Sequence, residues 1–153
     1  MRLWLLSCGI VFLCGCTRTD GPVVGAAQSS IRGEKLFNTY CAACHRRGGQ
    51  GEQGRVPPLD GSPWVSGSED RLTRIVLNGL RGPIEIKGQM YNLEMPAFRT
   101  LFKDDDIASI LAYVRRRYGS PSPSITTKTV TRVRHETQDR KRYWTVEELL
   151  RIP

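Results

Sequence analysis

The chain has 153 residues, a formal net charge of +8, 39% hydrophobic residues, five cysteines and two histidines. This length suits one domain with appendages rather than two enzyme domains, and the hydrophobic content argues against wholesale disorder. Because the number of cysteines is odd, they cannot all pair in an intramolecular disulfide framework. The sequence has no run of about 18 apolar residues, so it predicts no membrane-spanning helix.

The amino-terminal segment 1–16, MRLWLLSCGIVFLCGC, has the layout of an export signal. Arg2 precedes an apolar stretch that is too short to cross a bilayer. The ending LCGC, residues 13–16, resembles a bacterial lipobox, which implies a signal peptide over 1–15 and lipidation of Cys16. The alternative is an ordinary signal that is cut near residues 25–27.

Lipidation of Cys16 predicts an exported protein that is anchored to a membrane on its periplasmic side. Thr17, rather than Asp, follows this cysteine, which favours the outer membrane by the sorting behaviour of such lipoproteins. Residues 16–30 are then a lipid-anchored tether, because they mix Gly, Pro, Ala, Ser and Thr without periodicity.

The two cysteines of the predicted folded domain form the run Cys41-Ala42-Ala43-Cys44-His45. C-x-x-C-H is the attachment signature of c-type haem, because cysteines three apart on a helical turn present both sulfurs to one porphyrin. The histidine then offers a ring nitrogen to the iron. The alternatives are a zinc half-site, which lacks its second cysteine pair, a thioredoxin-like pair, which lacks a βαβ setting, and a disulfide.

On this motif, residues 31–118 resemble a class I mono-haem cytochrome c, which has an all-α fold of three to four helices around one covalent haem. The resemblance implies a first helix over about 30–41, with Ser29 or Ser30 as its cap. It also implies that Gly33 and Phe37 pack against the last helix, Gly33 by allowing close backbone approach.

A glycine-rich loop over 46–54 follows, and it lacks the Gly-Lys-Ser/Thr ending of a phosphate loop. After it, Pro57 and Leu59 match the Pro-x-Leu of the family. There the proline carbonyl orients the ligand histidine and the leucine packs on the haem, with Pro58 as an alternative acceptor. Trp64 either donates its indole N–H to a haem propionate or packs in the core.

A second helix is expected to begin at Ser66 or Ser68 and to end at Gly79. Residues 84–91 suggest a short hairpin before the last helix. Cytochromes of this class usually complete the iron with a methionine from a Met-Pro pair in the loop before that helix. Met95 fits this setting, whereas Met90, its competitor, lies in the hairpin.

The last predicted helix runs from Asp104 to Tyr118, with Asp104 as its cap and basic residues at its end. Residues 119–153 form a C-terminal extension of docked short helices. We expect one helix over 125–137, although its β-branched residues also suit a strand, and a second one with a capping box of Thr145 and Glu148. The polar, basic surroundings of His135 disfavour it as an iron ligand.

The sequence thus predicts a one-electron carrier, not an enzyme, with one covalent haem c whose iron is ligated by His45 and Met95. A thioether ligand stabilises Fe(II) and closes the sixth position. The alternatives are a haem enzyme or sensor with an open sixth position, and a haem-free structural lipoprotein.

The charge balance bears on partners. The domain 31–118 has 14 basic and 10 acidic side chains, and the extension has 7 basic and 4 acidic ones. A basic surface favours docking to an exported dehydrogenase or a respiratory oxidase with an acidic surface. Export argues against a nucleic-acid partner.

Overall fold

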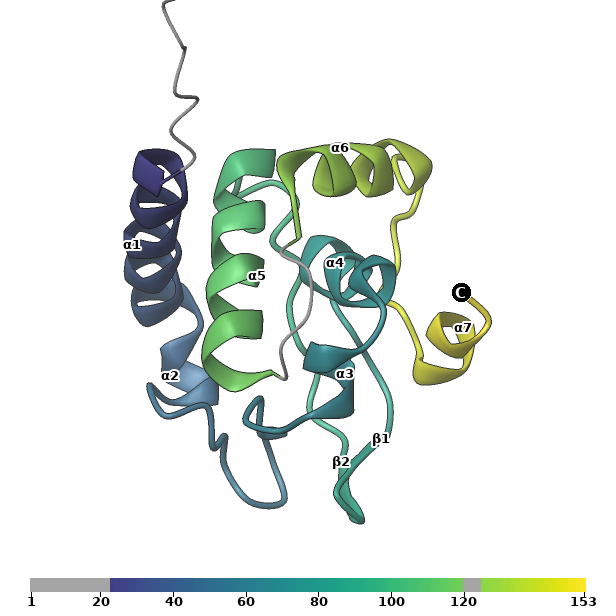
Figure 1. Cartoon of the computed structure of the whole chain (residues 1–153). Coiled ribbons are helices and arrows are strands. Elements are labelled where there is room, and N and C mark those ends of the chain that lie inside the picture. Colours follow the sequence, from purple (N-terminus) through teal and green to yellow (C-terminus); the bar gives the residue numbers. More distant parts are fainter. Residues whose placement is uncertain (1–22, 120–124) are drawn as a thin grey trace, which may run out of the picture.

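Helices dominate the part of the chain that the structure describes, in which seven of them accompany one antiparallel hairpin (Figure 1). This computed structural model describes residues 23–119 and 125–153. The expected all-α class with a hairpin before the helix 104–118 is therefore confirmed. The predicted signal peptide and the lipidation site Cys16 lie outside the described residues. The elements in chain order are α1 (Val23–Tyr40), α2 (Ala42–His45), α3 (Pro63–Ser66), α4 (Glu69–Asn78), β1 (Ile84–Ile86), β2 (Gln89–Tyr91), α5 (Asp104–Tyr118), α6 (Thr127–Glu136) and α7 (Val146–Leu150).

The helices α1 and α5 lie side by side in close contact (Figure 1). A Cβ atom added to Gly33 would stand 2.0 Å from the carbonyl oxygen of Ser109 and 2.9 Å from Cβ of Tyr113. Phe37 is fully buried one turn further on, with its ring centroid 5.4 Å from that of Tyr113. The predicted packing of Gly33 and Phe37 against the last helix is confirmed.

The start of α1 differs from the prediction. The helix begins at Val23 rather than near residue 30, so it takes up the second half of the predicted tether 16–30. Ser29 and Ser30 lie inside the helix and are not its caps. The reason is a tertiary contact, because α5 offers partners to the residues just before Ile31. Ser29 Oγ lies 3.2 Å from Ser109 Oγ, and Arg116 donates to Ser30 Oγ.

The helix α5 has the predicted bounds, Asp104–Tyr118, but its cap differs from the prediction. Its cap position is Lys103, which makes no side-chain capping bond, and Asp104 is the first helical residue. The carboxylate of Asp104 is instead engaged by α6, where it accepts hydrogen bonds of 2.5 Å from both Thr131 and Arg134. Asp104 therefore joins two helices rather than capping one.

The C-terminal extension docks on the rest of the protein through two helices. Val130 and Val133 of α6 are fully buried in the main core, and Leu149 of α7 is fully buried in a second cluster beside the hairpin. Residues 127–136 are therefore a helix, as expected, and not a strand. At α7, the predicted capping box of Thr145 and Glu148 is present.

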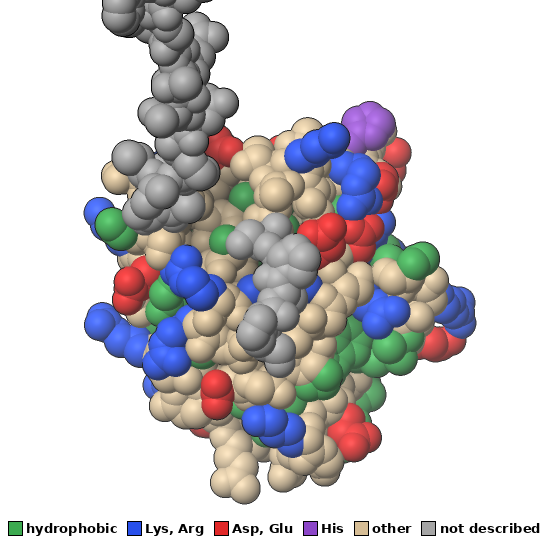
Figure 2. Space-filling model, viewed as in Figure 1, with side chains coloured by type: hydrophobic (Ala, Val, Ile, Leu, Met, Phe, Trp, Pro, Cys, Tyr) green, Lys and Arg blue, Asp and Glu red, His purple; other side chains and the backbone are tan. Residues whose placement is uncertain are grey.

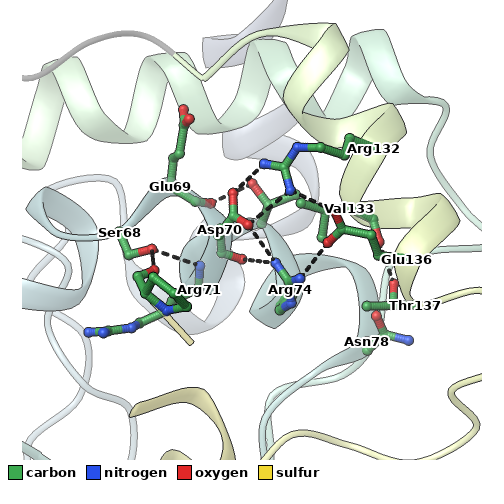
Figure 3. A network of polar contacts seen from close by, with 12 residues as sticks. Ser68, Glu69, Asp70, Arg71, Arg74, Asn78, Arg132, Val133, Glu136 and Thr137 are labelled. Atoms are coloured by element: carbon green, nitrogen blue, oxygen red, sulfur yellow. Dashed lines mark hydrogen bonds and ion pairs between the residues drawn. The ribbon is translucent and has the colours of Figure 1, made fainter. Parts of the chain in front are cut away.

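Ion pairs join α6 to α4 at the molecular surface (Figure 3). Asp70 accepts bonds from Arg74 at 3.0 Å and from Arg132 at 2.5 Å. Glu136 accepts from the same two guanidinium groups at 2.6 and 2.9 Å. The four side chains thus form a closed network between two helices that are far apart in the sequence.

Candidate functional site

An apolar cavity lies among the amino-terminal helices, α4, the hairpin and α5. It gathers every site residue that the sequence predicts for the folded domain, namely Cys41, Cys44, His45, Pro57, Leu59, Trp64 and Met95. Met90 does not line it and is 52% exposed on β2. The structure therefore separates the two candidate methionines.

The C-x-x-C-H run continues the helical path of α1 into α2. Cys41 N donates to the Phe37 carbonyl at 2.9 Å, and His45 N donates to the Cys41 carbonyl at 2.9 Å. Cys41, Cys44 and His45 thus occupy one helical turn. Arg46, with φ of 63°, ends this turn, and Gly51 N donates back to the His45 carbonyl at 3.0 Å. This hydrogen bond holds the glycine-rich loop next to His45.

Both cysteines of the motif are unpaired thiols in the structure. Burial raises the pKa of the Cys41 thiol to about 11, with the neighbouring Cys44 acting in the same direction. Thiols that serve thioredoxin-like exchange have lowered pKa values, because the thiolate is the nucleophile. Burial therefore makes Cys41 a poor nucleophile for such exchange.

His45 is the polar group at the centre of the site. Its Nδ1 atom is buried and finds no partner of good hydrogen-bond geometry among the described residues. Burial lowers the pKa of the imidazole, and the backbone of Pro57 opposes this shift as a hydrogen-bond acceptor. The backbone of Pro57, rather than that of Pro58, thus acts on the ring.

Met95 reaches the cavity from the loop between β2 and α5. Its backbone pairs with Leu80 through two hydrogen bonds, Met95 N to the Leu80 carbonyl at 2.9 Å and Leu80 N to the Met95 carbonyl at 3.1 Å. Leu80 itself is buried just after α4. The loop is therefore tied to a rigid element at the residue that carries the sulfur.

The walls of the cavity suit a large apolar ring. They are built mainly from aliphatic and aromatic side chains, including Ile75, Ile84, Ile86, Phe98, Phe102 and Leu111. Glu94 is the only carboxylate among the lining residues, and no group of three or more His, Cys, Asp or Glu that could hold a metal ion occurs in the described part of the chain. Two neighbouring thiols, an imidazole and a thioether around an apolar space fit haem c and do not fit a zinc site.

Sequence reasoning missed part of this cavity. Ile84 and Ile86 form one wall, and their buried–exposed–buried alternation along β1 is the signal that could have assigned them. Tyr40 and Leu93 also line the cavity while being 44% and 47% exposed. No periodic pattern distinguishes these two residues, because Tyr40 is the last residue of α1 and Leu93 lies in the loop after β2.

Comparison with known proteins points to the same chemistry. Residues 29–114 match the family described as cytochrome c oxidase, cbb3-type, subunit III. Cytochrome c-552 of Thermus thermophilus is 37% identical over 99 residues, which are 62% of this chain and 66% of that protein.

Two further relatives are parts of larger assemblies by name. The gluconate 2-dehydrogenase cytochrome c subunit of Pantoea cypripedii is 28% identical over 112 residues, 71% of this chain and 25% of that protein. The cbb3-type cytochrome c oxidase subunit FixP of Bradyrhizobium diazoefficiens is 29% identical over 99 residues, 63% of this chain and 33% of that protein. The chain thus spans less than two thirds of the length of these relatives. Among the described residues, none of the helices has the length and apolarity needed to cross a membrane.

Proposed function

Because the chain belongs to the family of the cbb3-type cytochrome c oxidase subunit III, whose members carry covalent haem c, we propose that it is a one-electron carrier. The observation that carries the proposal is the single apolar cavity that gathers a C-x-x-C-H turn and a methionine from a distant loop. When bound, the haem supplies reversible Fe(II)/Fe(III) chemistry.

Different residues of the chain hold different parts of the haem. Cys41 and Cys44 bond to the porphyrin, and His45 and Met95 ligate the iron. The Pro57 backbone, which acts on the His45 ring, would orient that ring toward the iron. Leu59 and Trp64, which line the cavity, contact the haem.

Met95 decides between a carrier and the alternative haem enzyme or sensor. A soft thioether stabilises Fe(II) and occupies the sixth position, so that small ligands are excluded. Two features support Met95 over Met90: it lines the cavity, and its backbone is tied to Leu80 on both its N–H and its carbonyl.

Electron exchange requires the haem cavity to reach the protein surface. Tyr40 and Leu93 line the cavity and are partly exposed, so the cavity reaches the surface where they lie. The excess of basic over acidic side chains, 14 to 10 in residues 31–118 and 7 to 4 in the extension, favours a redox partner with an acidic surface, such as a dehydrogenase or an oxidase. On the face drawn in Figure 2, basic side chains are spread out with acidic ones among them. The attraction therefore comes from the overall charge and falls as salt screens it.

The proposal includes the placement of the protein. Residues 1–15 are the signal peptide, and Cys16 carries lipid that anchors the protein on the periplasmic side of a membrane, the outer membrane where the cell has one. The cytochrome domain ends near residue 118, and 119–153 is the extension. Support comes from the lipobox-like residues 13–16 and from the need to attach haem outside the cytoplasm.

The test is the state of the haem in the purified full-length protein. We expect the haem colour to stay with the polypeptide after acid–acetone extraction, and the Cys41→Ser, Cys44→Ser double variant to lose it. We also expect the reduced protein to bind carbon monoxide negligibly. Extractable haem would contradict the covalent attachment, and avid carbon monoxide binding would favour the haem enzyme or sensor.

A further inference from the structure

The C-terminal extension contacts the loop that carries Met95 from behind Leu80. Leu80 lies between two backbone partners, with Met95 on one side and Trp144 on the other. Trp144 N donates to the Gly79 carbonyl at 3.1 Å, and Arg81 N donates to the Trp144 carbonyl at 2.8 Å. Leu80 is thus the middle segment of a short ladder, and the extension and the Met95 segment pair with its two sides.

Tyr143 lies next to Glu94 and Arg81, the chain neighbours of Met95 and Leu80. The carboxylate of Glu94, the residue before Met95, raises the pKa of the Tyr143 hydroxyl as a neighbouring acceptor, and Arg81 binds the same carboxylate at 2.6 Å. The Arg81 guanidinium lies 5.1 Å from the centre of the Tyr143 ring. A Cβ atom added to Gly79 would stand 2.4 Å from the Tyr143 ring and 2.5 Å from the Met95 carbonyl oxygen. Gly79 therefore fits between the Tyr143 ring and the Met95 carbonyl only because it has no side chain.

The extension also contacts the far end of the loop, at Arg99. Arg134 donates to the Arg99 carbonyl at 2.7 Å, and Arg99 donates to the Arg134 carbonyl at 3.2 Å and to the Thr137 carbonyl at 3.1 Å. Thr137 is buried at the end of α6. Both ends of the segment 94–99 are thus held by residues of the extension.

From these contacts we propose that Arg134, Thr137, Tyr143 and Trp144 form a brace that positions Met95 as the axial ligand. The proposal rests on the ligand assignment made above. The loop 92–103 contains no helix or strand of its own, and its backbone order depends on what packs around it. An iron–thioether bond is weak, so the fraction of time that the sulfur is bound depends on how well the loop is held.

This role differs from simple stabilisation of the fold, and the chain offers a matched control. Arg132 belongs to the same extension, and its side chain binds Asp70 and Glu136 in the network of Figure 3. Neither of these partners lies in the loop that carries Met95. Arg132→Gln removes bonds to Asp70 and Glu136 and none of the bonds that the four brace residues make themselves.

The test is imidazole binding to the oxidised, full-length protein at constant pH and ionic strength. Imidazole reaches the iron only when the sulfur has left, so its apparent affinity reports the population of the open site. We expect Tyr143→Ala to raise this affinity about tenfold, which corresponds to about 1.4 kcal/mol. Tyr143→Phe, which keeps the ring and loses the hydroxyl, should raise it about threefold, and it serves where the alanine variant does not fold. Arg132→Gln should change it by less than about 1.5-fold while lowering the thermal midpoint.

An unchanged affinity in both Tyr143 variants would overturn the brace. An increase in Arg132→Gln as large as that in Tyr143→Ala would do the same, because it would reduce the effect to global destabilisation. A Met95→Ala variant separates this failure from that of the ligand assignment. If that variant keeps the methionine–Fe(III) absorption band, Met95 is not the iron ligand, and the proposal of a brace for Met95 fails for that reason. If the band is lost and the Tyr143 variants bind imidazole as the wild type does, the brace alone is refuted.

Discussion

Replacing Gly33 by alanine tests the packing that places the haem-binding turn. The added Cβ would lie 2.0 Å from the Ser109 carbonyl oxygen, whereas ordinary contact begins near 3.4 Å. The obstacle is the backbone of α5, which cannot rotate away as a side chain can. The helices α1 and α5 would therefore have to separate by about 1.4 Å at this point.

The expected cost follows from two opposing effects. Overpacking of a close helix contact costs about 3 kcal/mol or more when backbone is the obstacle, and alanine regains about 1 kcal/mol of helix propensity. We therefore expect Gly33→Ala to lower the free energy of unfolding by about 2 kcal/mol. In guanidinium chloride this corresponds to a fall of the midpoint by about 0.5–1 M with an unchanged slope.

The assay is guanidinium unfolding of the haem-loaded protein, followed by far-ultraviolet circular dichroism. Glu34→Ala is the matched control, because Glu34 is an exposed neighbour on the same helix. This control should stay within about 0.5 kcal/mol of the wild type. A Gly33→Ala protein as stable as the wild type would refute the close approach of the two helices.

Two further predictions concern the extension. Arg132, as the main cause, and Arg74 hold the pKa of Asp70 below its ordinary value, so this ion pair stabilises the fold above about pH 4 and is lost as the pH falls through the folded pKa. The difference in unfolding free energy between wild type and Arg132→Gln should therefore shrink below pH 4, and a difference that grows with acid would contradict the network. Removing the capping box with Thr145→Ala should cost about 1 kcal/mol in thermal unfolding, and Thr145→Ser should restore most of it. Equal stability of the alanine and serine variants would show that the cap is not formed.

Local patterns in the sequence were enough to predict the chemistry of the site. The C-x-x-C-H run lies within one helical turn, so neighbouring residues alone determine where its three side chains point. The Met-Pro pair at 95–96 and the capping box of Thr145 are equally local. The buried close approach at Gly33 was also expected, since a glycine four residues before an aromatic is part of the family resemblance.

Errors arose where a distant element decides the local conformation. The tether was predicted to extend to residue 30, but α1 begins at Val23, and α5 provides partners for Ser29 and Ser30. Asp104 was expected to cap α5, but its carboxylate binds Arg134, which is 30 positions away. The pairing of Leu80 with both Met95 and Trp144 has no local signature, because each partner lies in irregular chain.

The identity of the sixth ligand tests the central claim most directly. The measurement is the methionine–Fe(III) charge-transfer band at the red edge of the visible spectrum, recorded on the oxidised full-length protein. We expect the wild type and Met90→Ala to show the band and Met95→Ala to lose it, since Met95 lines the cavity and Met90 does not. A band that survives in Met95→Ala, or high-spin iron in the wild type, would contradict a closed His45–Met95 electron carrier.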